Sequence, residues 1–352
     1  MINRREFMGR SAAIGAVFVG GGLSRDAFAQ SRPFTFVSWG GAFAKMQQTA
    51  FLDPFAASKG IETAIASPPD IAKIKGMVDA GAIEWDLLVL SGRGVWRGAD
   101  EGFLEPLDMA RIPNAKALKS EFVTPYGIVT SVGASVIAWA NDAFPNGGPE
   151  RWADFWDLKR FPGKRGMYKG LYWNYEVAML AEGLTSEEIY PVTDEKMDMA
   201  FKKLEELRPY VAVWWTSGPQ PAQLLTSGEV TLTSAWSGRV FNAIDGGAPI
   251  SFTFNNALAW GSHFCITKGS PHADLCHELI DYSIGMGPQS KLLELNVYGP
   301  SLEAAAAKAS DDVRKTLVLA PEHIGGLHFL NDREAATYEV KYEERWNQFL
   351  LG

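Results

Sequence analysis

The chain has little of the chemistry from which most catalytic and metal sites are built. Its 352 residues include only two cysteines and five histidines. The histidines show no H-E-x-x-H or similar spacing, which would place two metal ligands on one helix face. No G-x-S-x-G motif is present, and Gly92-Arg93-Gly94 lacks the third glycine of a dinucleotide-binding loop. We therefore expect no metal, no cofactor and no enzyme, although a site assembled from separate loops leaves no local motif.

Long hydrophobic runs are also missing, except near the N-terminus. Ser11–Leu23 is an apolar segment of thirteen residues, short of the roughly 20 that a membrane-spanning helix requires. Arg4 and Arg5 precede it and the A-x-A sequence Ala27-Phe28-Ala29 follows it, which is the order of an export signal. We expect residues 1–29 to be removed after Ala29 and the mature chain to work in the periplasm.

The two arginines resemble the twin-arginine export motif, in which a large apolar residue follows after one position. Here Glu6 and then Phe7 follow Arg5. An ordinary secretory signal with two incidental arginines is the alternative.

An excess of positive charge is absent as well. The net charge is −8, and removal of residues 1–29 takes away four arginines and two acids. An acidic chain is a poor candidate for nucleic acid, whose phosphates attract basic surfaces. Export would permit a disulfide between Cys265 and Cys276, but their apolar strand-like and helix-like surroundings favour two buried thiols.

The sequence does contain a regular alternation of strand and helix patterns. Strand-like, largely apolar runs alternate with segments of helical spacing, and runs that are apolar on both faces suit a mainly parallel sheet covered by helices. The expected strands are residues 33–39, 86–90, 131–140, 165–168, 212–215, 230–235 and 257–267. The expected helices are residues 42–60, 71–80, 175–181, 194–207 and 271–284, with a turn at 91–94. This pattern predicts an α/β fold.

The length of the chain favours two lobes, because single hydrophobic cores tend to split beyond roughly 250 to 300 residues. The strand at 131–140 with the Pro-, Gly- and Trp-rich loop that follows it at 141–152, and the region 257–267, are the candidate crossings between the lobes. A small-molecule site is expected in the cleft between the lobes. Lobe I would comprise residues 30–138 and 262–305, and lobe II residues 139–261 and 306–352.

Tryptophan is abundant, with twelve residues. Trp39, Trp236 and Trp260 stand beside glycines where strands end, and in open α/β sheets the loops after strands face the binding crevice. Aromatic faces there could hold an alkyl chain or an ammonium group, in a contact of about 0.5 to 2 kcal/mol. The alternative is that each tryptophan packs inside a lobe.

The order of several segments resembles the periplasmic spermidine- and putrescine-binding proteins of ABC importers over about 300 residues. The segments are FTFVSWGG at 34–41, DLLVLSG at 86–92, WADFWDL at 152–158, the helix at 203–207, SGEV at 227–230, SAWSGR at 234–239, Trp260 and VYGP at 297–300. The resemblance implies a type II-like two-lobed clamp hinged on two crossing strands. It also implies a small amine-bearing solute and an ABC permease of the inner membrane as partners. We expect a monomer.

In that family an aromatic box surrounds the polyamine while carboxylates bind its ammonium groups. The positions that match are the aromatics Trp39, Trp236, Trp260 and Tyr298, the turn residue Ser91 and the carboxylate Glu176. Two departures concern charge. The family's aspartate after the crossing tryptophan is missing, since Gly261, Ser262 and His263 follow Trp260, and Arg239 stands where the family carries a small or neutral residue.

These departures change the expected ligand. A buried ammonium without a partner costs several kcal/mol, whereas the planar fork of arginine suits a carboxylate. We expect a solute with an amine near Glu176 and an acid near Arg239 and Arg93, such as γ-aminobutyrate. A polyamine ligand, with Arg239 in a structural salt bridge, is the alternative. The alternative functions are an envelope enzyme with a site assembled in the cleft and a ferric-ion-binding clamp.

Overall fold

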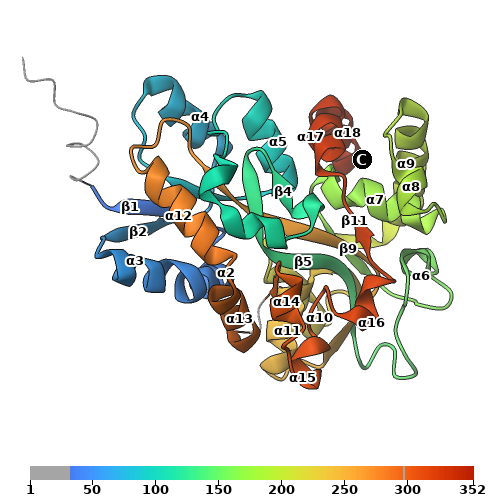
Figure 1. The fold of residues 1–352 in the computed structure, drawn as a ribbon. Coiled ribbons are helices and arrows are strands. Elements are labelled where there is room, and N and C mark those ends of the chain that lie inside the picture. The colour runs from blue at the N-terminus through green and yellow to red at the C-terminus, as the bar shows by residue number, and fades with distance from the viewer. Residues whose placement is uncertain (1–31, 296–297) are drawn as a thin grey trace, which may run out of the picture. The chain divides into compact units, whose positions relative to one another are not determined.

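The predicted alternation of strands and helices is present in the structure, a computed structural model that describes residues 32–295 and 298–352 (Figure 1). Residues 33–352 form a compact unit. The predicted export signal, its cleavage position after Ala29 and residue Val297 lie outside the described residues. No helix within the described ranges is long and apolar enough to cross a membrane.

The strands form a single mixed sheet. Its main path runs through β2 (Thr63–Ala66), β1 (Phe34–Val37), β3 (Leu87–Ser91), β9 (Ile250–Ile266), β5 (Gly127–Ala140), β8 (Leu232–Trp236), β6 (Arg165–Tyr168) and β7 (Val211–Trp215). The short strands β4 (Val123–Thr124) and β10 (Gly299–Pro300) pair with β5, and β11 (His328–Phe329) pairs with β9. The pairs at both ends of the path are parallel, as the apolar runs predicted, whereas the centre is antiparallel.

The two predicted crossings are the longest strands of the sheet. β5 and β9 have 14 and 17 residues and pair antiparallel from Ile128↔Phe264 to Ala140↔Ile250. β3 pairs with the last residues of β9, and β8 pairs with the last residues of β5. Both strands therefore span the β1–β3 half and the β6–β8 half of the sheet, in opposite directions (Figure 1). The predicted lobe boundaries fall inside β5 and β9, and their residue numbers stay a prediction.

Helices occupy most of the connections between strands. From the N-terminus they are α2 (Gly41–Gln47), the π-helical η1 (Gln48–Leu52), α3 (Asp53–Lys59), α4 (Ile71–Ala80), α5 (Gly92–Asp100), α6 (Trp152–Trp156), α7 (Leu171–Ala181), α8 (Ser186–Ile189) and α9 (Asp194–Leu207). They continue with α10 (Gln220–Thr226), α11 (Ser237–Asp245), α12 (Ala273–Ser283), α13 (Met286–Leu295), α14 (Glu303–Ala306), α15 (Asp311–Arg314), α16 (Pro321–Ile324), α17 (Asp332–Lys341) and α18 (Glu343–Leu351). The short 3-10 helices are η2 (Met109–Arg111), η3 (Pro113–Ala117), η4 (Ser120–Phe122) and η5 (Arg208–Tyr210).

One helix differs from the prediction, and a second has an irregular first turn. The segment predicted as a turn at 91–94 is the start of α5, where the Ser91 side chain accepts a hydrogen bond from the Gly94 N–H and caps the helix. Two glycines in its first turn hid the helical pattern. α7 is counted from Leu171, but Tyr172 and Trp173 have non-helical backbone angles, so its regular helix follows Trp173 and agrees with the predicted start near 175.

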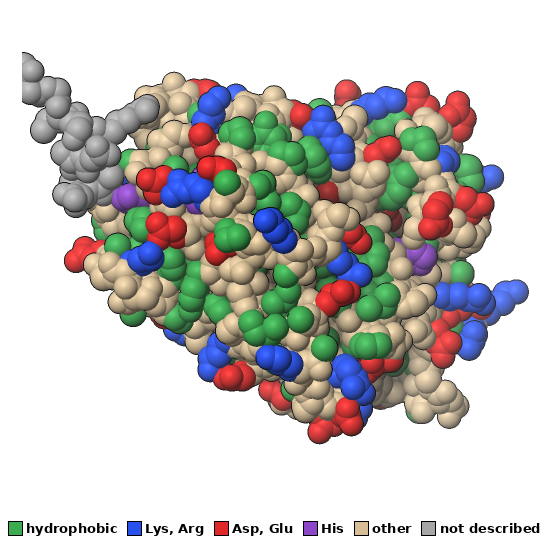
Figure 2. Space-filling model, viewed as in Figure 1, with side chains coloured by type: hydrophobic (Ala, Val, Ile, Leu, Met, Phe, Trp, Pro, Cys, Tyr) green, Lys and Arg blue, Asp and Glu red, His purple; other side chains and the backbone are tan. Residues whose placement is uncertain are grey.

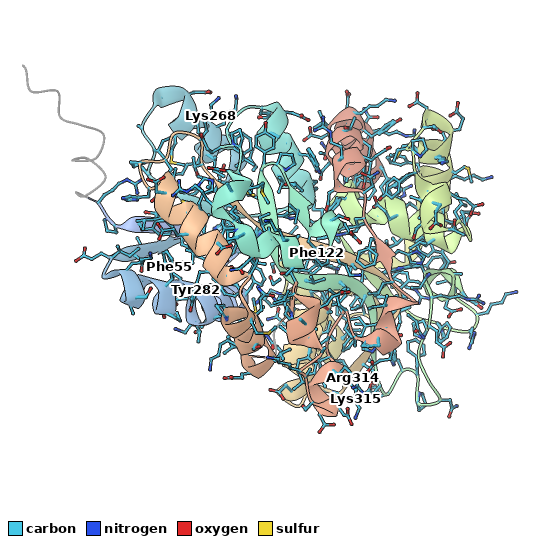
Figure 3. The ribbon with its side chains drawn as sticks, in the orientation of Figure 1. Phe55, Phe122, Lys268, Tyr282, Arg314 and Lys315 are labelled. Atoms are coloured by element: carbon cyan, nitrogen blue, oxygen red, sulfur yellow. The ribbon has the colours of Figure 1, made fainter. Side chains whose placement is uncertain are left out.

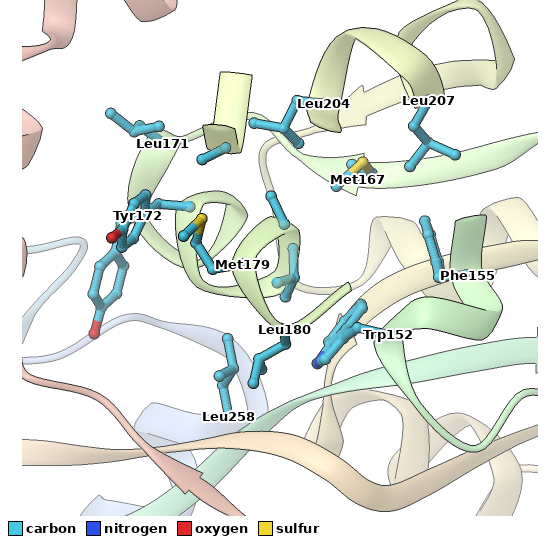
Figure 4. Close-up of a cluster of buried hydrophobic side chains, with 14 of the residues drawn as sticks. Trp152, Phe155, Met167, Leu171, Tyr172, Met179, Leu180, Leu204, Leu207 and Leu258 are labelled. Carbon is cyan, nitrogen blue, oxygen red and sulfur yellow. The ribbon is translucent and has the colours of Figure 1, made fainter. Parts of the chain in front are cut away.

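Separate hydrophobic cores lie on the two halves of the sheet. In the first half α3 and α12 meet at Phe55 and Tyr282, whose ring centroids are 5.8 Å apart (Figure 3). In the second half α6, α7 and α9 enclose a core that includes Trp152, Phe155 and Leu204 (Figure 4). The structure keeps Cys265 and Cys276 as buried thiols in two different clusters, as predicted.

Charged side chains of both signs alternate over the face drawn in Figure 2. This face therefore offers no continuous basic surface of the kind that binds a phosphate backbone.

Candidate functional site

A cluster of aromatic side chains joins the two halves of the sheet. We define the aromatic cluster as Tyr168, Tyr172, Trp173, Trp215, Trp236, Trp260 and Tyr298. Each ring contacts another member, with centroids 4.5 to 6.5 Å apart. Most of these pairs are tilted or edge-to-face, which are favourable arrangements for aromatic rings.

Strand ends supply three members of the cluster. Tyr168, Trp215 and Trp236 are the last residues of β6, β7 and β8. Because β7, β6 and β8 are neighbouring parallel strands, their carboxyl ends meet at one edge of the sheet. We predicted that tryptophans at strand ends lie at the edge of the sheet where crevices form, and Trp236 does lie there. Tyr168 and Trp215 lie at the same edge but were not among the predicted site residues.

The other half of the sheet supplies Trp260 and Tyr298. Trp260 lies in the crossing strand β9, and its ring covers Gly133 of β5, where an added Cβ would be 2.5 Å from the indole. Tyr298 precedes β10 and contacts both Trp260 and Phe43 of α2, at 5.3 and 5.2 Å. The structure thus brings the predicted residues Trp236, Trp260 and Tyr298 into one cluster.

Trp173 is the link between the two groups of rings. It contacts Trp236 at 5.7 Å and Trp260 at 6.5 Å. Its backbone has φ 72° and ψ −36°, a conformation that a bulky residue adopts only when its surroundings impose it. The Asn174 amide holds this turn by donating to the carbonyls of Tyr168 and Gly170, at 2.6 and 2.7 Å. The sequence signal was the aromatic run at 172–175 after a strand, which the prediction left outside the helix at 175–181 and did not interpret.

Arg239 lies in the first turn of α11, beside this cluster. Its guanidinium is close to Gly41 of α2 and to Gly218, where an added Cβ would be 3.4 Å from Nη1 and 3.0 Å from Nε. The Tyr298 hydroxyl is another neighbour; burial raises the pKa of Tyr298 to about 12, and the Arg239 charge opposes that rise. Within residues 32–295 and 298–352 no carboxylate pairs with Arg239, so the salt-bridge alternative has no support there.

Several buried nitrogen donors of Arg239 and of the aromatic cluster have no hydrogen-bond partner in the described part of the chain. They are Nε of Arg239 and Nε1 of Trp173, Trp215, Trp236 and Trp260. A buried donor without a partner costs about 1 to 3 kcal/mol. The same corner therefore combines an unpaired cation with unsatisfied N–H groups, an arrangement that favours an anionic oxygen ligand.

Glu176 is fully buried in α7 behind the Trp173 turn. Its Oε1 accepts hydrogen bonds from the hydroxyls of Tyr190 and Tyr338, at 2.9 and 2.8 Å. Burial raises the pKa of Glu176 to about 7, against the opposing effect of those hydroxyls and of nearby backbone N–H groups. The other carboxylate oxygen of Glu176, Oε2, has no hydrogen-bond partner among the described residues. Glu176 thus supports the turn that carries Trp173, and one of its oxygens is unengaged.

The remaining predicted residues lie around the start of α5. The Arg93 guanidinium forms an ion pair with Glu339 of α17 and lies 4.9 Å from the centre of the Tyr172 ring. Its charge is therefore already paired, unlike that of Arg239. Ser91 caps α5, and Trp39 is 45% exposed and makes no ring contact within the described ranges. These three residues line a small cavity of about 70 Å³.

A larger cavity of about 410 Å³ opens next to the aromatic cluster. Tyr168 is the member of the cluster that lines it, together with Arg93 and Thr216 and with residues of α17 and α18. Trp236, Arg239 and Trp260 do not line this cavity. Its volume falls in the usual range for small-molecule sites, but the unsatisfied donors lie in the adjoining group of rings. The described residues contain no group of three or more His, Cys, Asp or Glu side chains that could hold a metal.

Comparisons with known proteins agree with this architecture. Residues 50–318 match the bacterial extracellular solute-binding protein family. The γ-aminobutyric acid-binding protein of Pseudomonas aeruginosa is 32% identical over 322 residues, which are 91% of each chain. Spermidine/putrescine-binding periplasmic protein 1 of Haemophilus influenzae is 26% identical over 271 residues, 73% of each chain. The resemblance to polyamine-type binding proteins is therefore confirmed.

Solved structures confirm the predicted two-lobed α/β clamp. An ABC transporter substrate-binding protein from Bradyrhizobium japonicum superposes with a TM-score of 0.85 at 34% identity, covering 90% of this chain and 99% of that one. Two crossing strands, separate cores and an aromatic cluster that joins the two halves are the geometry of a hinged clamp. The chain belongs to the bacterial extracellular solute-binding proteins and is the exported solute-binding component of an ABC importer.

Proposed function

We propose that the protein captures a small amino-carboxylate, γ-aminobutyrate or a close ω-amino acid, and delivers it to an ABC permease of the inner membrane. The observation that carries this proposal is the setting of Arg239. It is a cation without an acidic partner among the described residues, next to buried N–H donors of the aromatic cluster.

The charge of Arg239 distinguishes the two ligand classes. A carboxylate would neutralise the guanidinium and accept hydrogen bonds from the indole nitrogens. An ammonium group at the same place would meet the like charge of Arg239 and indole N–H groups, which cannot accept its protons. A diamine is therefore the poorer ligand at this corner. The relative from Pseudomonas aeruginosa is a γ-aminobutyric acid-binding protein, which supports an amino-carboxylate as the ligand of this chain.

The rings of the cluster would hold the rest of the solute. Their faces can pack on a methylene chain and attract an ammonium group through cation–π contacts. The unengaged Oε2 of Glu176 is the carboxylate oxygen that we propose for the amine. Trp39, Ser91 and Arg93 would then shape the edge of the cleft rather than contact the solute's acid.

Capture needs no chemical step. Ligand contacts made from both halves of the clamp stabilise the closed arrangement and shift the population toward it.

We also propose that the chain works in the periplasm as a monomer, after twin-arginine export and cleavage behind Ala29. Residues 30–138 and 262–305 would form one lobe, and residues 139–261 and 306–352 the other. No specific observation favours an envelope enzyme or a ferric-ion clamp.

A calorimetric titration of the mature chain tests the proposal. The panel is γ-aminobutyrate, 5-aminovalerate, putrescine and spermidine, together with a thermal melt of each mixture. We expect binding of the two amino acids and a raised melting temperature, because a ligand at 100 times its Kd stabilises the fold by about 2.7 kcal/mol. Binding of the diamine and the polyamine without the amino acids would overturn the proposal.

A further inference from the structure

Helices α5 and α17 face each other from the two cores of the molecule. Val95 of α5 packs in a cluster with Leu88 and Leu90 of β3. Ala335 and Tyr338 of α17 pack in the other core, which contains Trp152 and is shown in Figure 4. Figure 1 shows the two helices beside each other at the top of the molecule. Contacts between them therefore join the two halves of the clamp.

Ion pairs connect the two helices near both ends of α17. Arg93 of α5 pairs with Glu339, and the Arg333 Nη1 donates to both carboxylate oxygens of Asp100, at 2.7 and 2.8 Å. The Arg333 guanidinium also lies 5.0 Å from the centre of the Trp96 ring. Charged groups of α17 are thus matched by charged groups of α5.

The closest approach is between Asp332 and Gly92. The Asp332 Oδ1 accepts a hydrogen bond from the Tyr172 hydroxyl at 2.8 Å, and the carboxylate covers Gly92, the first residue of α5. A Cβ added at Gly92 would overlap it, lying 2.7 Å from the Asp332 Cβ and still closer to the carboxylate itself. The backbone N–H of Arg93 and the positive end of the helix dipole favour a carboxylate here, although burial raises the pKa of Asp332 to about 6.

We propose that α17 positions the two lobes for capture, with Asp332 seated on the bare backbone of Gly92 and with Arg333 and Glu339 paired to α5. This role rests on the proposed solute capture, because it concerns the arrangement in which the lobes enclose the ligand. The contacts form only when the lobes meet, so they raise the closed population before ligand arrives. A ligand that binds the closed form then has an apparent Kd that falls as that population rises.

Gly92→Ala separates this role from a purely structural one. Gly92 does not have a positive φ, so alanine fits its backbone and favours the helix. The methyl group would collide with Asp332 only when the lobes are together. We expect an unchanged or higher melting temperature without ligand, together with a Kd for γ-aminobutyrate weakened at least tenfold. Gly94→Ala is the matched control, because its Cβ would make only ordinary contacts, 3.4 Å or more, to Ser91 and Leu90.

A charge exchange between the helices gives a second, independent test. Asp100 and Arg333 are half exposed, at 55% and 50%, so changing them spares both cores. Asp100→Arg and Arg333→Asp should each weaken binding a few-fold, and the double variant should recover most of that loss.

The closed population can be measured without any ligand. Dyes on Asp79→Cys of α4 and Lys202→Cys of α9 would report the distance between the lobes by single-molecule energy transfer, since both native cysteines are buried. We expect Gly92→Ala to lower the high-transfer population relative to Gly94→Ala. If the two variants gave equal populations and equal affinities, the role of α17 would be refuted. If the wild type bound no amino acid, the proposed function would fail while this distance measurement still decided the role of α17.

Discussion

Arg239 and Arg93 show how the same residue type acquires different roles at the scale of single side chains. Each is the third residue of a Ser-Gly-Arg sequence that follows a strand. Arg93 meets Glu339 and is neutralised, whereas Arg239 meets glycines, aromatic rings and the Tyr298 hydroxyl. The unpaired arginine is therefore the one that can bind a solute's carboxylate.

Arg239→Ala should abolish most of the affinity for an amino acid while the fold stays intact. A hydrogen bond to a charged group contributes about 1.5 to 3 kcal/mol, which corresponds to roughly 10- to 150-fold in Kd. Calorimetric titration with γ-aminobutyrate measures the loss. Arg314→Ala is the control, because that arginine lies on α15 and pairs there with Asp311 and Glu322. Equal affinity in both variants would contradict a carboxylate-binding role for Arg239.

Glu176 makes the stability of the protein depend on pH. Its folded pKa of about 7 exceeds the value of 4.5 for an unburied glutamate because burial disfavours the charge. Between these values the folded state binds more protons than the unfolded state, so the free energy of unfolding falls as pH rises from 4.5 to 7. The total loss is on the order of 3 kcal/mol.

Urea denaturation of the wild type and of Glu176→Gln between pH 4 and 8 measures this effect. Glutamine keeps an oxygen for the two tyrosine hydroxyls but cannot ionise, so the slope between pH 4.5 and 7 should become shallower. Asp332, whose pKa burial raises from 3.8 to about 6, should retain its own loss of stability between those pH values in the same variant. An unchanged profile in Glu176→Gln would show that Glu176 does not titrate in this range.

At the scale of elements, the crossing strands do more than connect the lobes. Gly133 of β5 leaves the space that the Trp260 ring of β9 occupies, so the hinge and the aromatic cluster are one packed structure. The kinked first turn of α7 likewise places Trp173 between Trp236 and Trp260. Local periodicity predicted these strands and the body of α7, but it could not predict the kink, because tertiary contacts impose the positive φ of Trp173.

Gly133→Ala should displace the Trp260 ring and weaken solute binding about tenfold or more, since the methyl group would be 2.5 Å from the indole. Tryptophan fluorescence and the Kd for γ-aminobutyrate report the two effects. Gly76→Ala in α4 is the matched control, because nothing lies within 4 Å of its Cβ. That control should bind normally and be as stable as the wild type, or more stable by about 0.4 to 1 kcal/mol.

At the scale of the whole molecule, the two cores and the two crossing strands allow the halves to move against each other. The proposed solute contacts come from both halves, since Trp236 ends β8 and Arg239 follows in α11, whereas Trp260 and Tyr298 lie at β9 and β10. Binding should therefore reduce the radius of gyration in solution, as measured by small-angle scattering with and without saturating γ-aminobutyrate. A radius that stayed constant would indicate a clamp that is already closed before it binds.

The sequence by itself determined the α/β class, the two crossing strands, the buried thiols and two members of the aromatic cluster, Trp236 and Trp260, whereas Tyr298 came from the resemblance to the polyamine-binding family. These features depend on local patterns, in which apolar runs mark strands and glycines follow strand-end tryptophans. Only the tertiary structure decided which arginine is free to bind. Arg93 and Glu339 are 246 positions apart in the sequence. The two Ser-Gly-Arg sequences are identical, so only the residues that the fold places beside each arginine distinguish them. Ion pairing depends on distance in space, and no local pattern in the sequence records that distance.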